Sequence, residues 1–154
     1  MSSALRIRLS EELKQSLQAR TEIKTATVRL ILAALKDRDI SARSKGNNEG
    51  ISDDDILSLL QTMIKQRNES VKMYQEGGRP ELAAREQAEI GVIEDFLPKQ
   101  LSEAEIEKVV RETIEKSEAT TVKDMGRVMA LLKAEYAGQM DFSKASLCVK
   151  KELL

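Results

Sequence analysis

The chain is poor in the residues that most enzyme and metal chemistry requires. Its 154 residues contain no histidine, no tryptophan and a single cysteine, Cys148. Without imidazole there is no histidine general base and no histidine-ligated zinc. One thiol can form neither an internal disulfide nor a thiolate cluster. We therefore expect no metal site and no bound cofactor.

Long apolar runs are also missing. No stretch of 18 consecutive apolar residues occurs, so we expect no membrane-spanning helix. The opening residues, MSSALRIRLSEEL, lack the apolar core of a secretory signal. Together with the single cysteine, these features favour a reducing compartment, and we expect a cytoplasmic protein.

Charged residues are abundant but balanced. Lys and Arg number 25 and Asp and Glu number 26, which gives no general attraction to nucleic acid. A composition rich in Ala, Leu, Glu, Lys and Arg and only 3% aromatic is typical of helices. No segment alternates apolar and polar residues long enough to indicate a strand. The sequence predicts an all-α fold.

Apolar residues recur with helical spacing in seven segments. The second segment is apolar nearly all round between Ile23 and Leu35, so we expect a central, well-buried helix there. The predicted helices cover about residues 4–20, 21–44, 53–76, 80–97, 103–118, 121–137 and 142–154.

Local signals mark where these helices begin and end. Ser52 precedes three aspartates, a pattern that indicates an N-cap and an acidic first turn. Gly77-Gly78 followed by Pro80 predicts a tight break between two antiparallel helices. Pro98 stops the next helix, and Ser102 with Glu105 forms a capping box just after it. Asp141 should cap the last helix.

These signals predict two helical domains. Residues 1–98 should form an N-terminal domain of about four helices that includes a long helical hairpin. Residues 99–154 should form a small C-terminal tail domain of three helices. A bundle this short has a small core, so docking on the first domain or on a partner is plausible.

No catalytic arrangement is recognisable. A serine nucleophile would need a lysine base, and the nearest grouping, Ser41 to Lys45, lacks a glycine-rich oxyanion turn. The phosphate-binding glycine motifs are absent. Asp53 to Asp55 point apart by about 100° per residue on a helix, so capping explains them better than a metal ion. We expect no catalytic residues.

The last third of the chain carries basic residues at helical spacing. Lys123 and Arg127 are four residues apart, and Lys144 and Lys151 are seven apart, so each pair can meet phosphates from one helix face. Gly126 lies inside the same predicted helix, where glycine costs about 1 kcal/mol relative to alanine. Either another helix packs closely against Gly126 or a ligand does, and we expect close helix packing.

Three stretches resemble a known family. Residues 27–45, 59–106 and 123–146 are similar to YqeY-like proteins of the GatB/YqeY domain family, most specifically at YQEGGRPELA, FLPKQLSEAEI and DMGRVMALL. The resemblance implies an all-helical protein with a small C-terminal helical domain. It also implies a relation to the C-terminal helical tail of the aspartyl/glutamyl-tRNA amidotransferase B subunit, which engages tRNA.

The resemblance leads to a functional hypothesis. It implies a non-catalytic, tRNA-binding adaptor with a role in translation, and it places RNA contact at Lys123, Arg127 and Lys133. Charge alone adds Lys144, Lys150 and Lys151. Family members are associated with carbon–nitrogen ligase activity that uses glutamine as amido donor, but the catalytic centres belong to other domains, so we expect no enzyme activity from this chain alone.

Two alternatives remain open. The chain could be a protein-interaction module that docks on a translation or metabolic complex through an apolar groove between its two domains. It could also be an accessory to a glutamine-dependent amidotransferase whose catalytic subunits are separate proteins.

Overall fold

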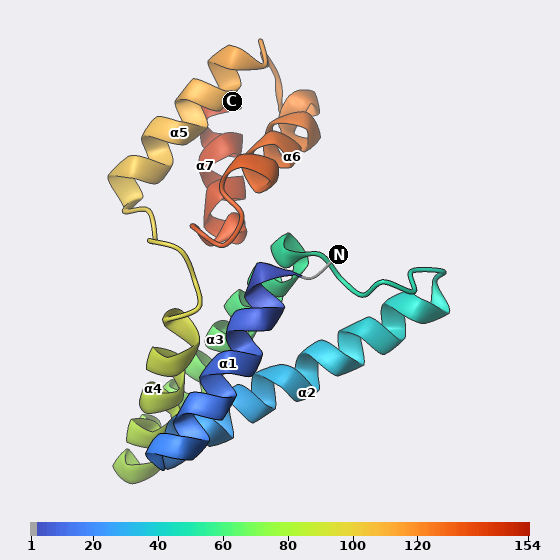
Figure 1. Cartoon of the computed structure of the whole chain (residues 1–154). Coiled ribbons are helices and arrows are strands. Elements are labelled where there is room, and N and C mark those ends of the chain that lie inside the picture. Colours follow the sequence, from blue (N-terminus) through green and yellow to red (C-terminus); the bar gives the residue numbers. More distant parts are fainter. Residues whose placement is uncertain (1–2) are drawn as a thin grey trace. The chain divides into compact units, whose positions relative to one another are not determined.

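A computed structural model describes residues 3–154 of the chain. Over this range it contains helices and no strand, which confirms the predicted all-α class (Figure 1). A short 3₁₀ turn, η1 (Val122–Asp124), precedes the sixth helix. The α-helices are α1 (Ala4–Ala19), α2 (Glu22–Ser44), α3 (Asp53–Glu76), α4 (Pro80–Glu94), α5 (Glu103–Lys116), α6 (Met125–Glu135) and α7 (Phe142–Leu153).

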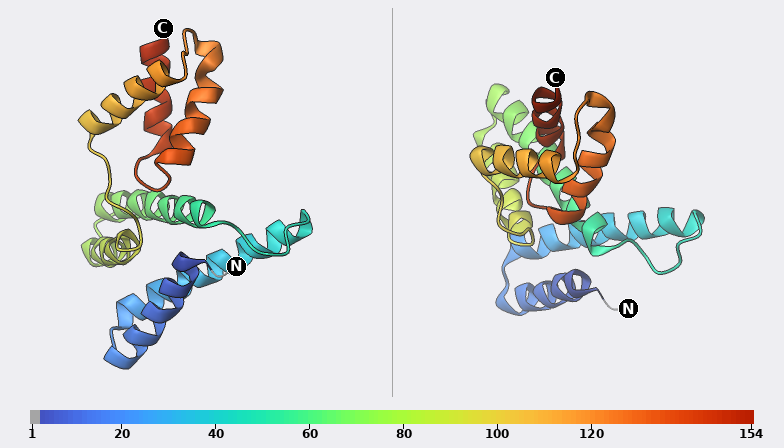
Figure 2. Two further views of the ribbon diagram at one scale, coloured as in Figure 1. Left: turned by 45° about the horizontal axis from the view of Figure 1, so that its top comes forward. Right: turned by 90° about the horizontal axis from the view of Figure 1, so that it is seen from above.

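The helices fall into two compact units. Unit 1 comprises Met1–Leu97 with α1 to α4, and unit 2 comprises Pro98–Leu154 with α5 to α7. In unit 1, α3 and α4 form a hairpin, and α2 packs against α1, α3 and α4 (Figure 1). The last turns of α2 extend beyond the other helices of unit 1 in both views of Figure 2.

Capping residues start the helices where the sequence indicates. The Ser52 hydroxyl accepts a hydrogen bond from the Asp55 backbone N–H, and Pro80 occupies the first turn of α4. Gly78, with φ +72°, lies in the left-handed region that glycine adopts without strain. The hairpin therefore turns where the chain has the residue types for it.

The prediction of a central, well-buried helix is confirmed for α2 only in part: it contacts the three other helices of unit 1, but some of its apolar side chains are exposed. Val28, Ile31 and Leu35 enter the main core of unit 1, but Ile23 and Leu30 are each 47% exposed. The three other helices of unit 1 pack against α2 and, within the described residues of that unit, leave Ile23 and Leu30 partly uncovered.

A polar network fixes the loop between α2 and α3. The Arg6 guanidinium donates two hydrogen bonds to the Asp39 carboxylate, at 2.7 and 2.8 Å, and a third to the Ile51 carbonyl. Asp39 also accepts from the Ile51 N–H at 2.9 Å. Gly50 lies against this pair with φ +91°, and a Cβ there would meet the Arg6 Nη2 at 2.8 Å. The network ties α1, α2 and the loop together.

A second ion pair joins the two helices of the hairpin. Arg67 Nε donates to Glu89 Oε2 at 3.0 Å, and the two side chains are only 13% and 12% exposed. Arg67 also reaches the Met63 carbonyl. At the other end of α4, Arg8 lies over the ring of Phe96 at 4.9 Å and donates to the Asp95 carbonyl, which ties α1 to the end of α4.

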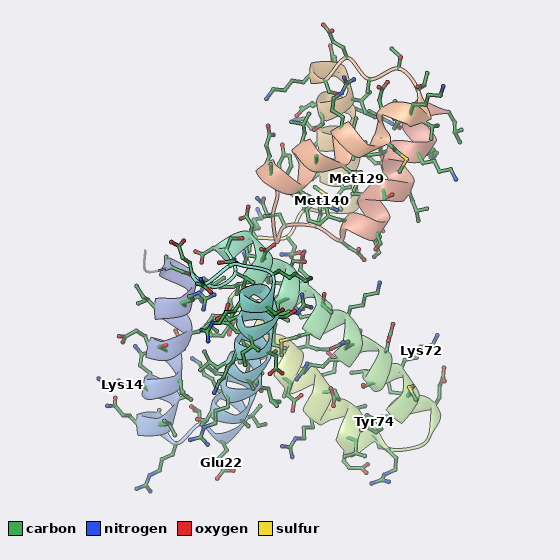
Figure 3. The ribbon with its side chains drawn as sticks, turned by 90° about the vertical axis from the view of Figure 1, so that its right-hand side faces the viewer. Lys14, Glu22, Lys72, Tyr74, Met129 and Met140 are labelled. Carbon is green, nitrogen blue, oxygen red and sulfur yellow. The ribbon has the colours of Figure 1, made fainter. Side chains whose placement is uncertain are left out.

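Unit 2 is a small three-helix bundle. Its α6 and α7 lie side by side while α5 crosses them (Figures 1 and 2). The centre consists of buried aliphatic side chains from all three helices, and Met129 packs against them while Met140 is 2% exposed (Figure 3). Those buried side chains are Val110, Val128, Leu132, Val149 and Leu153.

Hydrogen bonds close the ends of this bundle. Ser102 and Glu105 form the predicted capping box at the start of α5, and Asp141 accepts from the Ser143 N–H at the start of α7. The Leu101 N–H donates to the Gln139 carbonyl at 2.8 Å, which ties the chain before α5 to the α6–α7 connection. Unit 2 is thus held by an apolar centre and by caps.

Candidate nucleic-acid interface

The α6 helix presents one apolar and one open face. Val128 and Leu132 are fully buried, while Arg127, Ala130 and Lys133 are exposed. Lys123, in η1 immediately before α6, is exposed as well. The three cations that the family resemblance assigned to RNA contact therefore all lie at the surface of one short segment.

Asp124 anchors the start of this segment. Its carboxylate accepts hydrogen bonds from the backbone N–H groups of Thr120 and Thr121, at 2.9 and 3.2 Å. These two bonds, with a smaller contribution from Arg127, hold the pKa of Asp124 below its ordinary value, so it stays charged. Arg127 Nη2 lies 3.4 Å from this carboxylate, which makes Arg127 a partly engaged cation.

The α7 helix supplies the other predicted cations. Ala145, Val149 and Leu153 are buried against the bundle, whereas Lys144, Lys150 and Lys151 are exposed. Leu147 lies on the same open side as the lysines and is 71% exposed. The open side of α7 is therefore basic with one prominent apolar side chain.

The lysines of unit 2 differ in whether a carboxylate neutralises them. Five lysines have no carboxylate within ion-pair distance among residues 3–154. They are Lys123, Lys133, Lys144, Lys150 and Lys151. By contrast, Arg111 and Lys116 of α5 pair with Glu152 and Glu135, each at 3.3 Å. Cations of α5 thus pair with Glu135 of α6 and Glu152 of α7.

These pairings separate charge within unit 2. The exposed glutamates gather on α5 and just after it, at positions 103, 105, 107, 112, 115 and 118. Five lysines without a carboxylate partner lie on η1, α6 and α7, and two more, Lys99 and Lys108, lie before and on α5. A near-neutral chain therefore carries a local basic surface, which is the feature that an RNA phosphate backbone requires.

The prediction of close helix packing at Gly126 is wrong. A Cβ placed on Gly126 would meet nothing within 4 Å, so the position is open. Packing within the described chain therefore does not require glycine there. The backbone of α6 is accessible beside Arg127 and Lys123.

Aromatic side chains do not contribute to this surface. Tyr136 and Phe142 pack against the core of unit 2, so they offer no stacking platform for bases. Cys148 packs there too, and burial, followed by the charges of Glu107 and Glu152, raises the pKa of its thiol. Contacts made here would be to phosphates, which position a nucleic acid without reading its sequence.

Other site classes are not seen in the described part of the chain. Over residues 3–154, no three acidic or cysteine side chains are grouped so that they could hold a metal ion. None of the helices in that range has the length and apolar content needed to cross a bilayer.

Comparisons with known proteins give the chain its relatives. Altered inheritance of mitochondria protein 41, mitochondrial, is 26% identical in Vanderwaltozyma polyspora, over 76% of this chain and 64% of that protein. The proteins of the same name in Lachancea thermotolerans and Eremothecium gossypii are 31% and 32% identical, over 66% and 58% of this chain. The chain spans between 46% and 64% of the length of these relatives.

The prediction of a cytoplasmic protein is contradicted by these relatives, because they are named as mitochondrial proteins. A low cysteine content indicates that disulfides are absent and cannot distinguish one reducing compartment from another.

The family itself is shown directly, since the match extends over nearly all of the chain. From residue 6 to residue 153 the chain matches the family described as Yqey-like protein, and it belongs to that family.

Proposed function

We propose that the protein is a non-catalytic adaptor that binds tRNA through the basic surface of unit 2. The observation that carries this proposal is the set of five lysines on η1, α6 and α7 without a carboxylate partner. Lysines left unpaired beside an accessible helix backbone suit phosphate oxygens.

The arrangement of α5 supports the same function. Arg111 and Lys116 neutralise Glu152 and Glu135, the acids of α6 and α7 that would otherwise repel phosphates. The ion pair with Asp124 orients the Arg127 side chain. A phosphate that binds Arg127 must therefore either share the guanidinium with Asp124 or displace that carboxylate. We therefore expect Lys123 and Lys133 to matter more than Arg127.

Because the contacts go to phosphates, binding should depend steeply on salt. Each phosphate contact lowers log K by roughly 0.7–0.9 per tenfold rise in salt. Titrating labelled tRNA with the full chain from about 50 to 300 mM salt measures this slope. RNA from a mitochondrial pool belongs among the probes, because the curated relatives are named as mitochondrial proteins. Absence of binding at the lowest salt would overturn the proposal.

A matched pair of triple variants identifies the surface. Lys133→Glu, Lys144→Glu and Lys151→Glu together should weaken tRNA binding at least about tenfold and flatten the salt slope by about one per lysine. The control is Lys65→Glu, Lys72→Glu and Lys108→Glu, three exposed lysines elsewhere in the chain. Both triples change the net charge equally, so equal losses would show general attraction and no interface.

The exposed Leu147 separates RNA binding from protein docking. An RNA backbone gains little from this leucine, so Leu147→Ala should leave tRNA affinity unchanged. If tRNA affinity is absent and Leu147→Ala abolishes capture of a protein from nuclease-treated lysate, the surface serves a protein partner. A separate assay of glutamine-dependent amidation of misacylated tRNA, with and without the chain, tests the accessory hypothesis.

A further inference from the structure

The outer face of α2 carries apolar side chains that unit 1 leaves uncovered. Ile23 and Leu30, two turns apart, are each 47% exposed. Ala26 and Ala34 lie between and beyond them and are partly exposed. At about 100° per residue, Leu30 lies beside the buried Ile31 on the helix surface, and Ala34 packs against the core that contains Ile31 and Leu35.

Two shallow clefts flank this face. One, of about 490 Å³, lies between α2 and α4 and is lined on the α2 side by Glu22, Ile23 and Ala26. The other, of about 360 Å³, lies between α2 and α3, where Leu30, Ala34 and Arg38 face Leu59 and Met63. Each cleft has room for apolar side chains from a helix laid along α2.

The ridge of α2 along these clefts has an unusual symmetry. Glu22, Ala26, Leu30, Ala34 and Arg38 recur every four residues and so form one continuous ridge of the helix. Side-chain size is symmetric about Leu30, with alanine on both sides. Charge is opposite at the two ends, with an acid at the start and a base at the finish.

This symmetry is what a two-fold contact requires. If a two-fold axis passes through Leu30, residues equally distant from it face one another in the two copies. Ala26 then faces Ala34 of the second copy, and Glu22 faces its Arg38. The alanines let the two backbones approach closely, and the packing of i±4 ridges from both helices gives a crossing angle of about 50°.

We propose that unit 1 pairs with a second copy of this chain through the outer face of α2, in an antiparallel contact centred on Leu30. Charge complementarity selects this occupant. Glu22 and Arg38 are exposed, and within residues 3–154 no ion pair uses either one (Figure 3 shows Glu22 at the start of α2). A second copy supplies both missing partners, and the two-fold axis forms each pair twice.

The contact is modest in size, so the dimer should depend on concentration. One helix face with two flanking clefts offers less than the roughly 800 Å² per partner of stable interfaces. Sedimentation velocity of the nuclease-treated full chain, from about 5 to 500 µM, should show monomer converting to dimer as concentration rises. A single monomeric species at every concentration would overturn the proposal, including the case in which a different protein covers α2.

Substitutions at the centre test the placement. Leu30→Glu brings two carboxylates together on the axis and should abolish the dimer. The matched control is Ile7→Glu, because Ile7 is 50% exposed and lies on the side of α1 away from the buried Leu9. The control should dimerise like wild type. A dimer that survives Leu30→Glu would place the contact elsewhere and refute this interface.

Charge exchange tests the register. Glu22→Arg sets two arginines opposite each other and Arg38→Glu sets two glutamates opposite each other, so each should weaken dimerisation at least about tenfold. The double variant Glu22→Arg/Arg38→Glu restores opposite charges and should recover affinity to within about threefold. If the double variant is as weak as the single ones, the antiparallel register is wrong. Thermal unfolding by circular dichroism confirms that every variant is folded.

Discussion

The two units use their charged residues in opposite ways. In unit 1, Arg6, Asp39, Arg67 and Glu89 lie partly buried between helices and bind one another or the backbone. In unit 2, the cross-helix pairs Arg111–Glu152 and Lys116–Glu135 are more exposed, and the lysines of α6 and α7 have no carboxylate partner. Unit 1 thus has partly buried ion pairs between its helices, whereas the ion pairs between the helices of unit 2 lie at its surface.

Exposed large apolar side chains occur in both units at a similar density. Among residues 3–154, nine large apolar side chains are exposed, and six of them belong to unit 1, including Ile23, Leu30 and Met73. Unit 2 exposes Val122, Leu147 and Leu154. Exposed apolar side chains alone therefore do not distinguish the two units, and the proposals rest on how the charged residues around them are arranged.

The largest effect should come from the apolar core of unit 1. Leu60 is 0% exposed at the centre of that core. Leu60→Ala removes buried methyl groups and leaves a cavity, so it should lower the free energy of unfolding by about 2–5 kcal/mol, as measured by urea denaturation. If Leu60→Ala lowers the free energy of unfolding by less than Glu89→Leu or Asp39→Asn does, then polar contacts stabilise unit 1 more than its apolar core.

The second largest loss of stability should come from breaking the Arg67–Glu89 ion pair between α3 and α4. Glu89→Leu leaves the Arg67 guanidinium partly buried without its carboxylate, which should cost about 2 kcal/mol. The double variant Arg67→Leu/Glu89→Leu removes the stranded charge and should recover much of that loss. Arg85 lies 3.7 Å from Glu89 and is 66% exposed, so Arg85→Leu serves as a control with little effect.

The Arg6–Asp39 contact should give unit 1 a specific pH dependence. Hydrogen bonds from Arg6 are the main reason that the pKa of Asp39 lies below its ordinary value of 3.8. The stabilisation is therefore complete above that value and is lost as pH falls through the lower folded-state pKa.

Asp39→Asn tests this dependence. It should cost about 1–2 kcal/mol at neutral pH, because Asp39 is 23% exposed and holds both Arg6 and the Ile51 N–H. Thermal unfolding from neutral pH down to about pH 2 should show the difference between variant and wild type shrinking in acid. A constant difference across that range would mean that the Asp39 charge is not responsible.

The sequence predicted the parts of this fold that depend on local signals. Ser52, Pro80, Ser102 and Asp141 start helices as expected, because a cap depends on residues within one turn. Tertiary pairs could not be predicted in this way. Arg6 and Asp39 are 33 residues apart and Arg67 and Glu89 are 22 apart, so only the packing of the helices brings them together.

The candidate site could be predicted only in part. Composition and the family resemblance indicated six basic residues, but they could not show which of them a carboxylate already neutralises. The spacing of Asp124 and Arg127, three apart, is a helical pairing signal that could have marked Arg127 as engaged. The exposure of Ile23 and Leu30 had no local signal, since it depends on which side of α2 the other helices cover.

The smallest expected change in the free energy of unfolding comes from Gly126→Ala, and it should be an increase. Gly126 lies in the first turns of α6 with helical backbone geometry and open space around it, so Gly126→Ala should stabilise the protein by about 0.5–1 kcal/mol. Gly78 also has open space, but its φ of +72° strains any other residue. Gly78→Ala should therefore destabilise by about 1 kcal/mol. Urea denaturation of the two variants distinguishes backbone geometry from space. If both substitutions shift stability in the same direction, backbone geometry does not decide the outcome, and the explanation from φ and helix propensity is wrong.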